Sequence, residues 1–198
     1  MRINCINSYK PAFCAQFSND KQTKAILKNQ IQKSSHLYWA YLVYKYMPQM
    51  GDGTVSLKPI KNDMIELSNS ATGNSVQYPK DAFFFNMLDM ISVNAFEQSY
   101  LNEYQLIESG YDHDCKKFFG TDQLVTEPDV LLLNQAIGEL QEKAGTTPIH
   151  NQMADIIATK RKLHKKDKAN KEVLDYQFDI LYSKAEKQEK EYMLSLVG

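Results

Sequence analysis

A chain of 198 residues can bury one sizeable core, and its composition, 43% hydrophobic and 24% charged, excludes an intrinsically disordered protein. The formal net charge of −1 hides an uneven distribution, because residues 81–142 hold twelve acidic side chains and two basic ones. We expect a single domain, residues 1–198, that divides at most into a strand-rich lobe (1–80) and a helical lobe (81–198).

The first eighty residues predict most of the strands. A short strand is expected at about 12–17, and a helix over 21–33 after Asp20, because aspartate is a preferred N-cap. Three runs of mixed apolar and polar residues follow at 54–60, 64–69 and 75–78. Asn, Asp and Gly residues join them and make tight reversals, so these runs predict an antiparallel meander.

The segment 36–47, HLYWAYLVYKYM, is the most aromatic in the chain. Its β-branched and aromatic residues favour a strand buried on both faces, whereas the spacing of its apolar residues also suits a helix. Pro48 ends the segment in either case. The sequence leaves both structures open here.

From Asp81 the apolar residues recur at helical spacing as far as Gly110, and further helices are expected over 126–145, 147–166 and 170–196. Thr126 and Thr147-Pro148 are typical of helix starts. The predicted fold class is therefore α+β, with an N-terminal antiparallel β-meander packed with a C-terminal helical part of four to five helices.

The three cysteines, Cys5, Cys14 and Cys115, form no C-x-x-C pair, so neither a disulfide framework nor a zinc site is indicated and no cofactor is expected. The N-terminus lacks the apolar run of a signal peptide, and no stretch approaches the length of a membrane helix. These features predict a soluble protein of the cytoplasm with no membrane partner.

The segment Asp112-His113-Asp114-Cys115 carries the best candidates for chemistry. The adjacent His113 and Asp114 are similar to the His-Asp pair with which helical HD-type phosphohydrolases bind a divalent ion. That resemblance implies a metal-dependent phosphohydrolase, which would need an earlier histidine, and the one available, His36, lies far upstream. The alternative is that Asp112 caps a short helix and the next two side chains are solvated.

A basic segment covers residues 160–171, with seven basic side chains and Asp167, a balance of +6. Such a field attracts polyanions, including nucleic acids, although helix C-termini favour lysine through the dipole and solvated loops tolerate it. No aromatic residue interleaves the segment to stack on a base. The candidate anion-binding residues are Lys160, Arg161, Lys162, Lys165, Lys166, Lys168 and Lys171.

The aromatic side chains of segment 36–47 are candidates for an interface, with packing in the core as the alternative. They are Tyr38, Trp39, Tyr41, Tyr44 and Tyr46. Motifs of phosphate-binding loops, zinc proteases and serine hydrolases do not occur. The sequence favours a non-catalytic binding, adaptor or regulatory protein that works through contacts with a protein partner or a second copy of itself. Enzymatic activity and nucleic-acid binding are the less favoured alternatives.

Overall fold

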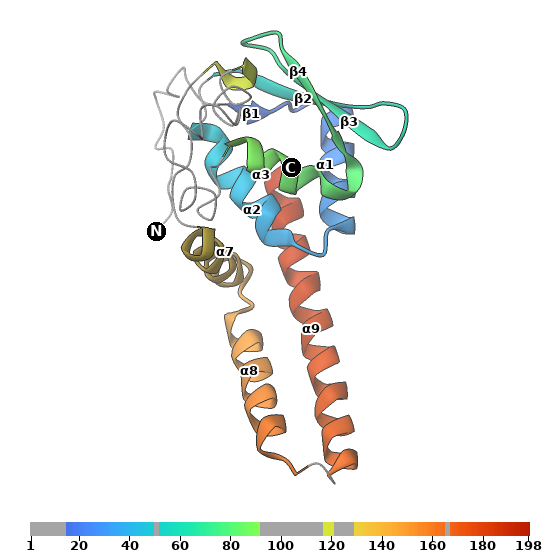
Figure 1. The fold of residues 1–198 in the computed structure, drawn as a ribbon, viewed down its shortest axis with the longest axis vertical. Helices are drawn as coiled ribbons and strands as arrows, with labels where there is room; N and C mark the ends of the chain where they lie inside the picture. Colours follow the sequence, from blue (N-terminus) through green and yellow to red (C-terminus); the bar gives the residue numbers. More distant parts are fainter. Residues whose placement is uncertain (1–14, 50–51, 92–116, 121–128, 165–166) are drawn as a thin grey trace, which may run out of the picture. The chain divides into compact units, whose positions relative to one another are not determined.

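A computed structural model describes residues 15–49, 52–91, 117–120, 129–164 and 167–198 (Figure 1). The chain forms two compact units, Met1–Leu133 and Asn134–Gly198, which we call the sheet unit and the hairpin unit. The division into lobes at residue 80 stays a prediction. No helix in the described ranges is long and apolar enough to cross a membrane.

The sheet unit contains a four-stranded sheet whose strands lie in sequence order: β1 (Gln16–Phe17), β2 (Thr54–Pro59), β3 (Met64–Asn69) and β4 (Ser75–Pro79). Strands β2, β3 and β4 are antiparallel, which confirms the predicted meander. Strand β1 runs parallel to β2, so the sheet is mixed rather than purely antiparallel. The reason is that two helices connect β1 to β2, and such a crossover returns the chain in the same direction.

One face of the sheet forms the core of the unit. Val55, Leu57, Ile65 and Leu67 are buried on this face, whereas the residues between them are exposed or partly exposed. Helix α1 (Lys21–Lys33) packs against β2, and α3 (Phe83–Ile91) contacts β4. Figure 1 shows α1, α2 (Leu37–Tyr46) and α3 on the same side of the sheet. The alternation predicted from the sequence therefore separates a core face from a solvent face.

Helix α1 begins where the sequence predicts. The Asp20 carboxylate accepts a hydrogen bond from the Thr23 N–H at 2.8 Å, as an N-cap does. The buried Thr23 hydroxyl donates to the same carboxylate at 2.7 Å and accepts from the Leu57 N–H at 3.0 Å. This one side chain thus joins the first turn of α1 to the middle of β2.

The aromatic segment 36–47 is a helix, α2 (Leu37–Tyr46), followed by a 3-10 turn, η1 (Met47–Gln49). The buried residues of α2 include Leu37, Ala40 and Tyr41, at the spacing of neighbouring turns on one helical face. Helix α2 packs against α3. Packing on a neighbouring helix therefore decides between the two structures that the sequence left open.

The segment after the meander forms η2 (Lys80–Ala82) and then α3, so the predicted helix from Asp81 begins at Phe83. A helical turn at 117–119 ends at Gly120. The Asn69 side chain anchors this turn, because its amide donates to the Phe118 carbonyl at 2.9 Å and to the Asp52 carbonyl at 3.3 Å. Asn69 is buried, so a polar side chain connects three separate parts of the unit.

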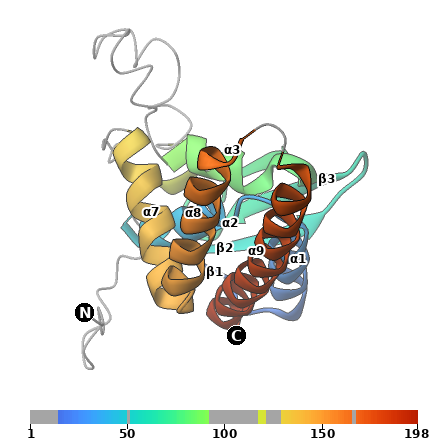
Figure 2. The ribbon, with the colours of Figure 1, turned by 90° about the horizontal axis from the view of Figure 1, so that it is seen from below.

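The hairpin unit contains most of α7 (Asp129–Ala144) together with α8 (Thr147–Lys162) and α9 (Lys168–Val197), close to the predicted helices. Helices α8 and α9 lie side by side in both ribbon views (Figures 1 and 2). Ile149, Met153 and Ala185 form their buried core, with Phe178 and Leu181 packed against it. Residues four apart on α8 therefore face residues three and four apart on α9, as in a two-helix coiled coil.

Candidate functional site

A groove of about 750 Å³ opens on the sheet unit. Three stretches that are distant in the sequence line it: residues 30–39 from the end of α1 and the start of α2, the β2–β3 turn at 62–64, and residues 79–85 at the start of α3. A half-open cavity of this size accommodates a small ligand or a few side chains of a peptide.

Three rings form the aromatic wall of the groove. The ring centroids of Trp39 and Phe85 are 5.1 Å apart, and those of His36 and Trp39 are 4.6 Å apart. Both pairs are tilted, at 56° and 46°, an arrangement that aromatic rings favour over face-to-face stacking. The wall therefore combines His36 from the loop before α2 and Trp39 from α2 with Phe85 from α3.

Phe85 faces outward because three phenylalanines follow one another at the start of α3. Successive residues of a helix turn by about 100°, so three neighbours cannot all face one core. Phe83 and Phe84 are buried, whereas Phe85 remains 45% exposed. Phe85 is the exposed aromatic anchor of the groove.

The loop between α1 and α2 positions His36. The backbone N–H of His36 donates to the Ser34 hydroxyl at 3.1 Å, and Nδ1 of the His36 ring lies 3.2 Å from the Tyr38 hydroxyl. Partial burial raises the pKa of Tyr38, which keeps the phenol neutral and able to donate. The imidazole is therefore fixed between Tyr38 and the Trp39 ring.

An ion pair also lines the groove. The Lys80 ammonium is 2.9 Å from the Asp63 carboxylate, and this hydrogen bond, with the charge of Lys80, lowers the pKa of Asp63. Asn62 and Asp63 have φ angles of 61° and 54°, which these two residue types tolerate better than most. The turn therefore presents a fixed charge pair beside an aromatic wall.

The five aromatic residues predicted as an interface divide between the groove and the core. Trp39 lines the groove and Tyr38 supports His36, whereas Tyr41 and Tyr46 are buried. Burial raises the pKa of Tyr44, whose hydroxyl has no hydrogen-bond partner among the residues that the structure describes. Their role in an interface stays a prediction.

The sequence reasoning missed Phe85, His36 and the pair Asp63–Lys80 as members of one site. One signal was present for Phe85, because a run of three phenylalanines in a helix must expose at least one ring. Asp63 and Lys80 offered no such signal, since 17 residues separate them and the pairing of β3 with β4 brings them together.

The basic segment lies at the end of the hairpin unit where α8 leads into α9. Lys160, Arg161 and Lys162 end α8, and Lys168 and Lys171 begin α9. Lys160 forms an ion pair with Asp175. The other four have no ion-pair partner among the described residues. Lys165 and Lys166 lie outside those residues.

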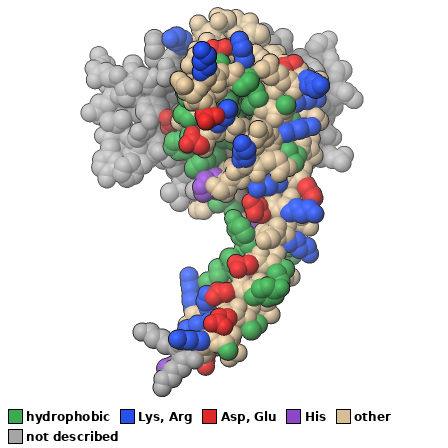
Figure 3. Space-filling model, turned by 90° about the vertical axis from the view of Figure 1, so that its right-hand side faces the viewer, with side chains coloured by type: hydrophobic (Ala, Val, Ile, Leu, Met, Phe, Trp, Pro, Cys, Tyr) green, Lys and Arg blue, Asp and Glu red, His purple; other side chains and the backbone are tan. Residues whose placement is uncertain are grey.

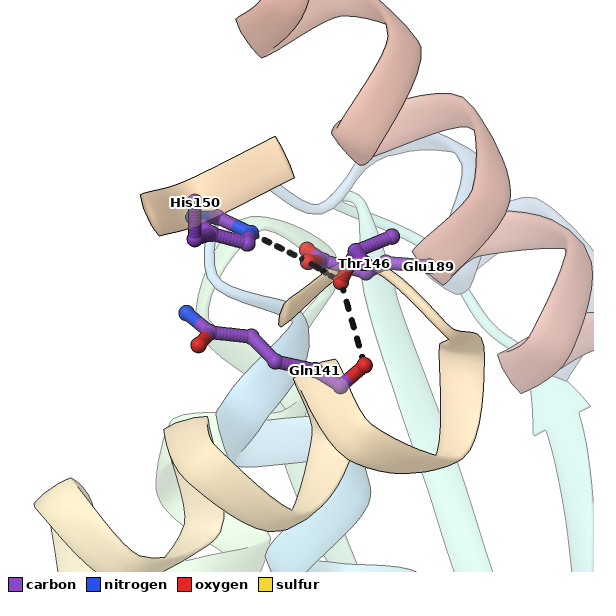
Figure 4. Close-up of polar contacts among 4 residues, drawn as sticks. All are labelled: Gln141, Thr146, His150 and Glu189. Carbon is purple, nitrogen blue, oxygen red and sulfur yellow. Dashed lines mark hydrogen bonds and ion pairs between the residues drawn. The ribbon is translucent and has the colours of Figure 1, made fainter. Parts of the chain in front are cut away.

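A polar cluster joins the α7–α8 turn to α9 (Figure 4). The Thr146 hydroxyl and His150 Nε2 each lie 2.7 Å from Glu189 Oε1, and the same hydroxyl is 3.3 Å from the Gln141 carbonyl oxygen. Thr146 is buried and the Glu189 side chain is 13% exposed. A carboxylate that is nearly enclosed and accepts two bonds of this kind holds the turn against α9.

Several large apolar side chains on the outer surface of the hairpin unit are exposed. Val173, Tyr176 and Ile180 on α9 are at least half exposed, and Tyr176 reaches 68%. On the side of the hairpin unit that Figure 3 shows, hydrophobic side chains lie between acidic and basic ones. The charged side chains interrupt the apolar surface on this side.

His113 and Asp114, like all three cysteines, lie outside the described residues. Among the residues that are described, no three His, Cys, Asp or Glu side chains are grouped so that they could hold a metal ion. A phosphohydrolase centre at His113 and Asp114 stays a prediction.

The chain matches no protein-family model, and comparisons with curated proteins and with solved structures find no significant match.

Proposed function

We propose that this protein is a non-catalytic binding or adaptor protein and that its groove takes an aromatic or large aliphatic side chain from a segment of a partner protein. The observation that carries the proposal is the exposed ring of Phe85 beside Trp39 and His36 in a groove of about 750 Å³. An aromatic wall of this kind contributes a large contact area with few side-chain torsions to restrict.

The surroundings of the wall support the same function. Energetically dominant residues of interfaces are typically aromatic and lie inside a polar rim that excludes water. Among the residues that line the groove, Lys80 and Asp63 form a charge pair, and Ser34 and Ser35 supply hydroxyl groups. The rim carries both signs of charge, so we expect a partner segment whose anchor is apolar and whose net charge is small.

The test uses a phage-displayed library of random 12-residue peptides, selected on the immobilised full chain. Trp39 is the single tryptophan of the sequence, so its emission reports directly on the groove. We expect the selected peptides to share an aromatic or large aliphatic residue and to change the Trp39 emission on binding. Trp39→Ala and Phe85→Ala should each weaken binding about thirtyfold, the loss of an anchor worth about 2 kcal/mol.

Tyr176→Ala provides the matched control, because Tyr176 is an exposed aromatic residue of the hairpin unit. It should bind the selected peptides as the wild type does, with affinity followed by anisotropy of a labelled peptide. Equal affinity of wild type, Trp39→Ala and Phe85→Ala would contradict the proposed function, as would a library from which no peptide binds above background.

Polyanion binding by the hairpin unit is a second candidate function. The observation that favours it is the presence of Arg161, Lys162, Lys168 and Lys171 on the adjoining ends of two helices, without ion-pair partners among the described residues. Cations in this arrangement neutralise phosphates and release counterions. Because Lys160 pairs with Asp175, the positive charge that this segment presents is smaller than the balance of +6 counted from the sequence.

A heparin column and a labelled single-stranded oligonucleotide test this candidate at low salt. Replacement of Lys162, Lys165, Lys166 and Lys168 by glutamine should abolish retention and lower the salt dependence of binding. Lys184→Gln with Lys187→Gln, both on α9 and outside the basic segment, is the control and should retain binding. Equal retention of the quadruple variant and the wild type would contradict polyanion binding.

A further inference from the structure

Strand β4 is an edge strand. It pairs with β3 on one side, and no strand of the described residues pairs with its other side. An unpaired edge presents a row of backbone N–H and C=O groups that an extended chain can complete as an additional strand.

The register shows which groups of β4 face outward. The Asn69 N–H donates to the Asn74 carbonyl at 3.0 Å, and the Lys80 N–H donates to the Asp63 carbonyl at 2.9 Å. Hydrogen-bonded pairs alternate along an antiparallel ladder. Residues 76 and 78 therefore direct their backbone groups to β3, and residues 75 and 77 direct theirs away from it.

The outward positions are accessible. Ser75, Gln77 and Pro79 are all exposed. Proteins commonly protect such edges with charged side chains, but β4 (SVQYP) has none and is limited by its length and by Pro79, which lacks an N–H. Pro79 also lines the groove, so the end of the β4 edge borders it.

The missing N–H of Pro79 favours a partner segment over a second copy of the chain. If two β4 edges paired antiparallel about Gln77, each Ser75 would face a Pro79 that cannot donate to it. Opposite a foreign segment only the one N–H that Pro79 lacks is lost, whereas two copies in this register would lose two. We propose that the outer edge of β4 takes an extended segment of the partner protein as a fifth strand, with an apolar residue of the same segment in the groove. This inference rests on the proposed function of the groove.

The test measures binding of a fluorescein-labelled peptide from the library selection to the full chain and two variants. Gln77→Pro removes an outward N–H without removing a bond to β3, and should weaken binding about tenfold or more. Gln77→Ala keeps the backbone and should bind within about twofold of the wild type. Circular dichroism checks that each variant is folded.

Peptides with N-methylated amides give a second test that does not depend on the folding of Gln77→Pro. One peptide carries methyl groups on its odd-numbered amides and the other on its even-numbered amides. One of the two should lose binding and the other should keep it, because alternate amides of a paired strand point toward its neighbour. Equal binding of the two methylated peptides would overturn strand addition.

The outcomes separate the two proposals. If Gln77→Pro binds like the wild type while Trp39→Ala does not, strand addition is wrong and the proposed function of the groove is supported. If Gln77→Pro loses binding while Trp39→Ala does not, the edge binds the segment and the role of the groove is wrong. A dimer in sedimentation that Gln77→Pro abolishes, without peptide binding, would assign the edge to a second copy and overturn the proposal.

Discussion

The sheet unit and the hairpin unit are stabilised by different kinds of contact. In the sheet unit, buried polar side chains bond to distant backbone: Thr23 reaches Leu57, 34 residues away, and Asn69 reaches Phe118, 49 residues away. In the hairpin unit, apolar side chains repeat along two adjacent helices, and the polar cluster at Glu189 lies at one end of α8. The sheet unit therefore adds a few long-range polar contacts to its apolar core, whereas the hairpin unit relies mainly on repeated apolar packing between two helices.

Gly53→Ala should give the largest effect and break the sheet unit. Gly53 has a φ of 107°, and a Cβ there would lie 2.1 Å from Asn69 Oδ1 and 2.9 Å from the Ala71 backbone nitrogen. Relief of this clash requires a shift of the backbone, which costs free energy. We therefore expect a loss of about 4 kcal/mol or more in the free energy of unfolding. Urea unfolding followed by Trp39 emission measures it.

Gly73→Ala is the matched control for that substitution. Gly73 also has a positive φ, 71°, but apart from its two chain neighbours no heavy atom of the described residues lies within 4 Å of the position of a Cβ there. Only the conformational cost remains, about 1 kcal/mol. Similar losses for the two variants would show that steric contact at Gly53 is not what matters.

Asn69→Ala sharpens the comparison, because it removes the anchor of the 117–119 turn without a steric clash. The buried amide donates two hydrogen bonds, and its oxygen accepts a third from the Ala71 N–H at 2.9 Å. We expect a loss of about 3 kcal/mol, again by urea unfolding. Asn74→Ala, which removes an exposed bond to the Lys117 carbonyl, should cost about 1 kcal/mol or less. A loss at Asn69 no larger than that at Asn74 would contradict the role of buried polar anchors.

Glu189→Ala is the corresponding change in the hairpin unit and should have a smaller effect. It removes the partner of Thr146 and His150 but leaves the apolar core intact. We expect a loss of about 2 kcal/mol, followed by helix ellipticity at about 222 nm during urea unfolding. Glu186→Ala removes a pair with Lys190 one turn apart and should cost about 0.5 kcal/mol. Equal losses would mean that the enclosed carboxylate contributes no more than a surface pair.

Asp20→Asn should have the smallest effect on stability, and we expect this effect to change with pH only at acidic pH. The Ser18 hydroxyl and then the Thr23 N–H and hydroxyl lower the pKa of Asp20 from 3.8 to about 2. A carboxyl whose pKa is depressed on folding adds stability above its unfolded value, and this stability is lost as the pH falls from about 4 to about 2. Thermal unfolding between those pH values should show a shallower decline for the variant than for the wild type. Identical pH profiles would exclude the cap as a source of acid sensitivity.

Local features of the fold could be predicted from the sequence, and long-range ones could not. Asn, Asp and Gly in the turns determine the meander, and Asp20 determines the start of α1, because both signals lie within a few residues. The parallel pairing of β1 depends on the path of two helices. The segment 36–47 is apolar on all sides, so its periodicity carries too little information to distinguish a helix from a buried strand.

The candidate site was predictable to a smaller extent. Trp39 was selected for its residue type, which interfaces favour. Phe85 lies 46 positions later in the sequence, and its distance from Trp39 is set by the packing of α2 against α3. The edge of β4 is likewise a property of the strand order. Sites made by packing between distant segments leave no pattern in a single sequence.

The bond from Asn69 to Phe118 also sets an order of events during synthesis. All four strands have been made once Pro79 leaves the ribosome, but the Phe118 carbonyl follows 39 residues later. At translation rates of about 5–20 residues per second, the nascent sheet waits for seconds with the Asn69 amide lacking one of its acceptors. The Phe118 carbonyl then supplies the missing acceptor, and this bond adds about 1 kcal/mol to the stability of the meander. The hairpin unit, made after the sheet unit, is built from contiguous chain and imposes no such delay.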